Sequence, residues 1–532
     1  MTKRHKKQHE SQTPRDVPAK VWTLVFLVVL LSTQLVNLDR DVIYLRPRVL
    51  NNDESTFILM ASGLLHGQLP YVDLYDIKPP GLFLVLAGVM SLFGESLSVV
   101  RHFGTFCLLV AAVASYGIVL RHTTSWVAGL SIAALMTLTG VPDFQSTMAE
   151  TVAIAMLMPA LWLLVARRGV LWAICLVGVL VSSATLVRTN VAYVALALAG
   201  YYLWRWWRGR PEVSLWEPVV YGAGGLMPLV LSVWVYWRAD ALDEFMFVNV
   251  MLIGRYAYGQ LGAMHAFWYF VDVLLSQAFV TRYAFLITVF IIGGLCLWVV
   301  NGKKARLWED SGPLVLVFGA LGLSILQSGQ GHMHYLLQLF PLVAVFTTLG
   351  FGTLTLHVCW KGKAAWVGVA LSVLVLIAGL MRYGSESVNH VVSQWDSLGR
   401  TPLQRVADLI REDDGGGKVF APTHHLIYWY LNQPPPSKVV HPDLLYSLAV
   451  PGGTFWGLVE HGYLSKDEFQ RVVAGDYDYI VLATDVSAWQ FMHPSIQEWF
   501  DKRLARDYVR WKEVPAFPRW EVVPGFVIYK RR

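Results

Sequence analysis

Residues 51–94 read NNDESTFILMASGLLHGQLPYVDLYDIKPPGLFLVLAGVMSLFG and join a polar loop to an apolar tail of ambiguous length. The tail begins at Pro79, and its length suits either a short membrane span or a helix lying at a membrane surface. Because each span reverses the side on which the chain emerges, this choice sets the side of every later loop. The stretch therefore decides the predicted fold.

The composition is that of a membrane protein. Of 532 residues, 55% are hydrophobic and 15% are charged, whereas soluble domains average about 25% charged residues. The mean hydropathy is +0.47, and apolar runs of about 18 residues or more recur, which is the length that crosses a bilayer as a helix. The first run, from Val21, follows a basic segment and lacks a small-residue cleavage site, so we expect a retained helix.

Charge and cysteine content exclude other classes. The formal net charge is +6, but the basic residues lie mainly in short loops beside apolar runs, which indicates orientation in a membrane rather than nucleic-acid binding. The four cysteines lie within or at the end of apolar runs, so neither a disulfide framework nor a zinc site is expected.

The positive-inside rule settles the ambiguous tail. If 79–94 does not cross, about eleven spans are expected, near 21–38, 98–120, 125–141, 149–166, 170–187, 190–204, 216–237, 283–300, 311–328, 334–355 and 364–381. The inside loops then carry the basic residues, namely Arg121, Arg167, Arg168, 205–210, 302–306, Lys361 and Lys363. If the tail crosses, all of these loops move outside. We therefore predict a surface helix at 79–94.

Three regions follow from this topology. We expect a basic cytoplasmic tail at 1–20, a transmembrane domain at 21–382 whose first outer loop is 39–97, and a soluble extracytoplasmic domain at 383–532. In the last region, strand-like segments at 418–422, 477–485 and 525–530 alternate with helix-like pieces such as 465–475, which predicts an α/β fold.

The conspicuous polar groups all fall on the predicted outer side, while the span centres are nearly free of charge. They are Asp53, Glu54, Asp73, Asp76, Lys78, 141–150, Arg188, Asn190, 243–259 and 328–335. Transporters usually place ionisable sites near the midplane, so a reaction at the outer boundary is favoured. A transporter or flippase of lipid-linked glycans, and a non-catalytic scaffold, remain the alternatives.

A substrate with a lipid tail and a polar head suits this boundary, and a lipid-phosphate-linked sugar is such a substrate. Glycosyl transfer needs a carboxylate that takes a proton from the acceptor hydroxyl. It also needs cations that offset the charge of the departing phosphate. Asp53 or Glu54 can supply the carboxylate, and Lys78 with one arginine, Arg188, Arg255 or Arg101, can supply the cations.

Taken together, the first-loop motifs resemble those of polytopic GT-C glycosyltransferases. The motifs are Asp53-Glu54, the GQLPY segment at 67–71 and KPPG at 78–81. The resemblance continues at Glu150, at Gly254-Arg255-Tyr256, and at His334-Tyr335 with Gln338 and Pro341, and it covers roughly residues 20–380. The branch it is most similar to contains lipid A aminoarabinose transferases, rhizobial galacturonosyltransferases and protein O-mannosyltransferases.

The resemblance implies a polytopic α-helical membrane protein with juxtamembrane helices in the first outer loop. It implies an inverting hexosyl- or pentosyltransferase in the plasma (inner) membrane, with a polyprenyl-phosphate sugar as donor and a lipid, glycan or protein as acceptor. Asp53 matches the family's catalytic carboxylate, Lys78 its phosphate contact and Glu150 its cavity acid; Asp76, Tyr256, His334, Tyr335 and Gln338 are further predicted cavity residues. No cofactor is required in this branch, although a divalent cation serves the related oligosaccharyl branch and remains an alternative here.

Each of these residues also has a structural interpretation. Asp53 and Glu54 can cap a surface helix, and Lys78 can reach the interface while Pro79-Pro80 starts a helix. Asp73 and Asp76 suit turns, and Glu150 can cap its span. His332 and His334 lack a clear third metal ligand.

Overall fold

The structure is a computed structural model, and it describes the chain from residue 52 with several gaps. The main described ranges are 52–123, 125–139, 147–208, 214–252, 305–327, 333–357, 401–413, 417–447, 456–465, 467–484, 494–516 and 525–532. The expected spans 21–38, 283–300 and 364–381, the basic tail and the boundary at 382/383 lie outside these ranges.

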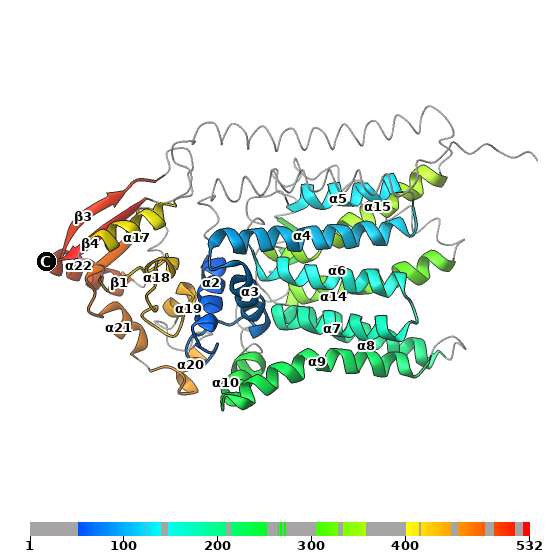
Figure 1. Cartoon of the computed structure of the whole chain (residues 1–532), viewed down its shortest axis with the longest axis horizontal. Coiled ribbons are helices and arrows are strands. Elements are labelled where there is room, and N and C mark those ends of the chain that lie inside the picture. Colours follow the sequence, from blue (N-terminus) through cyan, green and yellow to red (C-terminus); the bar gives the residue numbers. More distant parts are fainter. Residues whose placement is uncertain are drawn as a thin grey trace, which may run out of the picture.

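Apolar helices lie side by side and form a bundle (Figure 1). They are α4 (Leu97–Leu120), α5 (Ser125–Thr139), α6 (Ala149–Ala166), α7 (Leu171–Val187), α8 (Ala192–Trp207), α9 (Trp216–Arg238), α14 (Ala305–Gln327) and α15 (Phe340–His357). Each corresponds to an expected span. One start was predicted wrongly: the span expected from 334 begins at 340, because 333–338 form a separate 3-10 helix, η5 (Met333–Gln338). The apolar part of α14, Ser311–Gln327, agrees with the span expected near 311–328.

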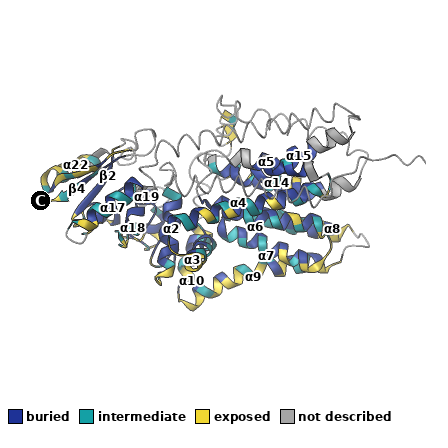
Figure 2. Cartoon of the chain, turned by 45° about the horizontal axis from the view of Figure 1, so that its top comes forward, coloured by how far each residue is buried: buried dark blue, intermediate teal, exposed yellow. Residues whose placement is uncertain are grey.

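Burial separates central from peripheral helices (Figure 2). Among the described residues, α4, α6 and α9 are long and apolar enough to cross a bilayer. In the most apolar window of α6, 67% of residues are buried, against 22% for α9. Large apolar side chains on α9 such as Val230 and Trp237 are about three-fifths exposed (61% and 63%). A broad exposed apolar face of this kind is typical of a surface that contacts lipid.

The predicted first outer loop contains two helices that lie across one end of the bundle (Figure 1). They are α2 (Asn52–Leu65) and α3 (Pro80–Phe93). With 14 residues, α3 spans only about 21 Å at 1.5 Å per residue, less than the ~30 Å of a hydrocarbon core. Several bundle helices are nearly as short, so the non-spanning helix at 79–94 stays a prediction, and its support is that α3 runs across the bundle helices rather than alongside them (Figure 1). Pro80 starts α3, where its missing N–H costs nothing.

Glycine allows α3 to start directly against the end of α7. A Cβ added at Gly81 would lie 2.7 Å from the backbone oxygen of Leu186, which is closer than real Cβ atoms approach. Gly81 is three residues after Lys78, and Leu186 is two residues before Arg188. The close approach therefore sets two cations near one another.

Gly81→Ala is expected to destabilise the fold by about 1–3 kcal/mol, the usual range for an overpacked interior. Gly88→Ala is the matched control, because Gly88 lies in the same helix and a Cβ there meets nothing within 4 Å. The control is expected to be neutral or slightly stabilising, since alanine is the better helix former. Thermal unfolding in detergent measures both, and equal midpoints for the two variants would refute the close contact.

Residues after 400 form a mixed four-stranded sheet with short helices. The strands are β1 (Val419–Phe420), β2 (Tyr479–Ala483), β3 (Tyr508–Val514) and β4 (Phe526–Arg531), in the order β1-β2-β4-β3. β1 pairs with β2 in parallel, and the other pairs are antiparallel, with Ile480 opposite Tyr529. The segments expected at 418–422 and 477–485 contain β1 and β2, and the segment expected at 525–530 overlaps β4. β3 was not predicted, because its charged residues interrupt the alternation of apolar and polar residues by which strands are recognised, as is common in edge strands.

Helices pack around this sheet. They are α17 (Pro402–Glu412), α18 (Leu426–Leu431), α19 (Pro442–Ser447), α20 (Gly457–Glu460), α21 (Glu468–Val473) and α22 (Pro494–Asp507). α17 begins with a capping box in which Thr401 and Gln404 exchange hydrogen bonds. Figure 1 shows α2 between this region and the helix bundle.

Candidate active site

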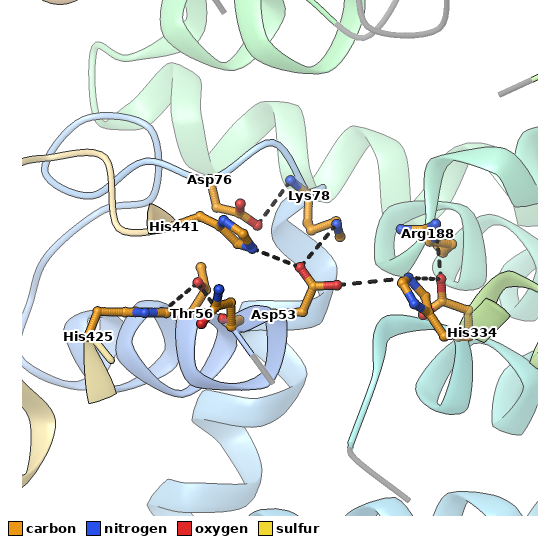
Figure 3. Close-up of polar contacts among 10 residues, drawn as sticks. Asp53, Thr56, Asp76, Lys78, Arg188, His334, His425 and His441 are labelled. Carbon is orange, nitrogen blue, oxygen red and sulfur yellow. Dashed lines mark hydrogen bonds and ion pairs between the residues drawn. The ribbon is translucent and has the colours of Figure 1, made fainter. Parts of the chain in front are cut away.

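Asp53 lies in the first turn of α2, and one of its carboxylate oxygens contacts both a lysine and a histidine (Figure 3). Its Oδ1 lies 3.1 Å from Nε2 of His441 and 3.8 Å from Nζ of Lys78. Both carboxylate and lysine are only 15% exposed. Such a position suits an ionised carboxylate, because each nearby positive group stabilises the charged form.

The second oxygen of Asp53 faces a different set of groups. Its Oδ2 lies 3.9 Å from Nε2 of His334, and the same nitrogen lies 3.9 Å from Oε1 of Glu150. Arg188 Nη2 contacts that glutamate oxygen at 2.9 Å, and the guanidinium lies over the ring of Tyr335 at 4.4 Å. Around the two oxygens of Asp53, two acids, two cations and two imidazoles thus converge.

The converging side chains come from the ends of separate elements. Lys78 precedes α3, Glu150 is in the first turn of α6, Arg188 caps the C-terminus of α7, and His334 belongs to η5. The backbone groups at helix ends need polar partners. Charged side chains are therefore accommodated at these ends more easily than on the apolar sides of the helices. The bundle thereby concentrates polar groups at one of its ends.

Electrostatics define the protonation states. Burial alone raises the pKa of Asp53, but Lys78, the hydrogen bond and charge of His441, and His334 outweigh it and hold that pKa well below its usual range. Burial lowers the pKa of Lys78 most, but Asp53, Asp76 and Tyr335 together outweigh burial and Arg188 and raise that pKa, so the lysine stays charged. Burial lowers the pKa of His334 below its ordinary value despite Glu150 and Asp53. At neutral pH the site therefore holds a carboxylate, an ammonium group and a neutral imidazole.

Glu54, predicted as a second catalytic acid, does not join this group. Its carboxylate is fully buried, its Oε2 contacts Arg101 Nη2 at 2.6 Å, and its Oε1 accepts a hydrogen bond from the backbone N–H of Thr147 at 3.0 Å. These contacts tie α2 to α4 and to the start of α6. Arg101 is thereby engaged away from Asp53.

The remaining predicted residues take different positions. Asp76 is buried and its Oδ2 accepts a hydrogen bond from the backbone N–H of Lys78 at 3.3 Å, so it shapes the loop that carries the lysine. Gln338 is buried in η5, and its amide has no hydrogen-bond partner within the described part of the chain. Arg255 and Tyr256 lie outside the described residues.

Sequence reasoning missed two histidines from the region after 400. His441 contacts Asp53, and His425 Nε2 lies 2.8 Å from Oγ1 of Thr56, one turn further along α2. No local pattern relates position 441 to position 53, which are 388 residues apart. Only tertiary structure reveals the contact.

The arrangement suits proton acceptance beside an anion. Across the ranges that the structure describes, no group of three or more His, Cys, Asp or Glu residues is placed to hold a metal ion. The carboxylate of Asp53 can accept a proton, and Lys78 with Arg188 can face a phosphate.

Comparisons with known proteins rest on structure. No protein-family model matches the sequence, and no curated protein matches it. ArnT from Cupriavidus metallidurans bound to undecaprenyl phosphate is 14% identical over 96% of this chain and 98% of its own, with a TM-score of 0.57. Its apo state is 13% identical with a TM-score of 0.58 and the same coverage.

The archaeal oligosaccharyltransferase AglB from Archaeoglobus fulgidus, in complex with an inhibitory peptide and a dolichol-phosphate, is also similar. It is 12% identical over 87% of this chain and 69% of its own, with a TM-score of 0.50. At these identities the likeness concerns the fold. The chain therefore has the fold of the GT-C membrane glycosyltransferases, which the resemblance of its first-loop motifs predicted.

Proposed function

We propose that this protein is an inverting glycosyltransferase that moves a sugar from a polyprenyl-phosphate donor to an acceptor hydroxyl at the outer face of the membrane. The observation that carries the proposal is the meeting of Asp53, Lys78 and Arg188 at one end of the helix bundle. A base beside two cations matches the charges of such a reaction, in which a proton leaves and a phosphate departs.

In the proposed reaction the acceptor oxygen attacks the anomeric carbon as the bond from that carbon to the phosphate oxygen breaks. The bonding electrons go to the phosphate, and the hydroxyl proton goes to Asp53. Lys78 and Arg188 stabilise the charge that develops on the phosphate. A single displacement from the opposite face inverts the anomeric configuration. The low pKa of Asp53 makes it a weak base, which suffices because the hydroxyl becomes acidic only as its new bond forms.

Solved structures with the same fold support the class of donor. One is described as bound to undecaprenyl phosphate and another as holding a dolichol-phosphate with a peptide. For this chain we accordingly propose a lipid-phosphate donor and a hexose or pentose as the sugar, with a lipid, glycan or protein as acceptor.

The direct test incubates purified protein with labelled polyprenyl-phosphate sugars and membrane acceptors and identifies the product by mass spectrometry. A covalent sugar–acceptor product with inverted anomeric configuration by NMR supports the proposal. Movement of unchanged donor across proteoliposomes, without a product, identifies a flippase instead. Retained configuration contradicts single displacement.

Lys78→Met is expected to raise the donor KM by about 10- to 100-fold, because a hydrogen bond to a charged group is worth about 1.5–3 kcal/mol. Lys78→Arg keeps the charge and is expected to recover part of the affinity. Lys438→Met is the matched control, since Lys438 lies over the ring of Tyr463. Initial rates against donor concentration provide the measurement, and an unchanged KM in Lys78→Met contradicts phosphate binding by this lysine.

A further inference from the structure

The region after 400 is tied to the first loop by backbone hydrogen bonds. The N–H of Tyr75 donates to the carbonyl of Lys438 at 2.6 Å, and the N–H of Val440 donates to the carbonyl of Tyr75 at 3.1 Å. The Tyr463 hydroxyl also donates to the carbonyl of Tyr71. Because backbone bonds of this kind fix a register, the two segments hold defined positions relative to each other.

This bridge holds both groups that contact Oδ1 of Asp53. Lys78 follows Tyr75 by three residues, and His441 directly follows Val440. The Lys78 ammonium and the His441 imidazole then meet the same oxygen at 3.8 and 3.1 Å (Figure 3). Since Asp53 is ionised, Nε2 of His441 is the donor in this hydrogen bond.

A second histidine supports the same face of α2. Thr56 lies three residues after Asp53, so the two side chains share one side of the helix. His425 is 3% exposed, and its Nε2 lies 2.8 Å from Oγ1 of Thr56. Two independent contacts from one segment thus hold the turn of α2 that carries the carboxylate.

We infer that His441 is a positioning residue for the carboxylate of Asp53, so that the region after 400 completes the catalytic site. The inference rests on the proposed function, in which Asp53 takes the acceptor proton. By occupying Oδ1 together with Lys78, His441 turns Oδ2 toward His334 and the Glu150–Arg188 pair (Figure 3). In the proposed reaction, the acceptor hydroxyl approaches Asp53 on that side, beside Arg188.

The pH dependence follows from the groups that face Asp53. They are Lys78 from the loop before α3, His334 from η5, Arg188 from the end of α7, and His441 and His425 from the region after 400. His441 lowers the pKa of Asp53, so its removal raises that pKa. Because the base must be ionised, the acid limb of the kcat/KM profile is then expected to move to higher pH.

The test compares His441→Ala with His441→Gln in the full-length protein, using transfer from a polyprenyl-phosphate sugar. His441→Ala is expected to lower kcat by about 10- to 100-fold, the scale of a misplaced reacting group. Donor KM is expected to change little, since Lys78 remains. Glutamine can place an amide N–H at the position that Nε2 of His441 occupies in the wild type. His441→Gln is therefore expected to keep most of kcat and to leave the acid limb of the kcat/KM profile near its wild-type pH.

His424→Ala is the matched control, because His424 packs edge-on against Phe526 and belongs to the same segment. Unchanged kcat and acid limb in His441→Ala overturn the inference, as does an equal loss in His441→Gln or in His424→Ala. Any of these results leaves the proposed function standing, provided that the wild type transfers sugar.

A second measurement does not depend on activity. Thermal midpoints of Asp53→Ala, His441→Ala and the double variant form a double-mutant cycle, because each single substitution removes the contact between the two side chains. Non-additive shifts support the contact, and additive shifts overturn it whether or not transfer is detected. Failure of the proposed function appears separately, as absence of transfer by the wild type.

Discussion

Asp53→Asn is expected to lower kcat by about 10²- to 10⁴-fold, the usual contribution of a general base. Asparagine keeps the size of the side chain but cannot take a proton from the acceptor hydroxyl. Its amide oxygen can still accept from His441 while its NH2 faces His334, so the fold is expected to persist. Product formation from a labelled polyprenyl-phosphate sugar is the measurement.

Asp73→Asn is the matched control from the same loop. Asp73 Oδ2 accepts a hydrogen bond from the backbone N–H of Leu69 at 2.8 Å, and an asparagine oxygen can keep this bond. We expect near wild-type turnover. Full transfer by Asp53→Asn, or an equal loss in both variants, contradicts the role of Asp53 as base.

Arg101→Met is expected to destabilise the protein by about 3–5 kcal/mol. The guanidinium and the carboxylate of Glu54 are 1% and 0% exposed and lie 2.6 Å apart. Removing one partner leaves a charge buried without compensation, which is the costly way to break such a pair. Replacing both residues by methionine is expected to cost much less, because no charge is then left behind. Denaturant unfolding in detergent, followed by tryptophan fluorescence, gives the free energies.

A surface ion pair of equal length provides the comparison. Lys502 Nζ also lies 2.6 Å from Glu498, but these side chains are 75% and 69% exposed. Lys502→Met is expected to change the free energy of unfolding by no more than about 0.5 kcal/mol, since water screens exposed pairs. If Arg101→Met and Lys502→Met lower the free energy of unfolding by similar amounts, the buried pair of Arg101 and Glu54 does not stabilise the packing of α2 on α4 more than an exposed pair would.

Much of the helical architecture was predictable because it depends on local composition. Apolar runs long enough for a bilayer identify their own helices, and α6 occupies the expected 149–166. The start of α15 was predicted six residues early, at 334 rather than 340. Residues 333–338 belong to a 3-10 turn that turns His334 and Tyr335 toward the site, and hydropathy does not register such a break.

The two adjacent acids show where prediction from sequence stops. Both suit a helix start and both carry a carboxylate, so residue type cannot distinguish them. They are neighbours on a helix, about 100° apart, and therefore face different surroundings. Asp53 meets Lys78 and His441, whereas Glu54 meets Arg101 inside the bundle.

The sequence by itself determined that the chain has many apolar helices and that its first loop is polar. These properties follow from composition and spacing, which act over short lengths of chain. Only the tertiary structure decided that Glu54 pairs with Arg101 and that His441 reaches Asp53 across 388 residues. Such pairs depend on how separate elements pack, and local patterns carry no information about contacts at that distance.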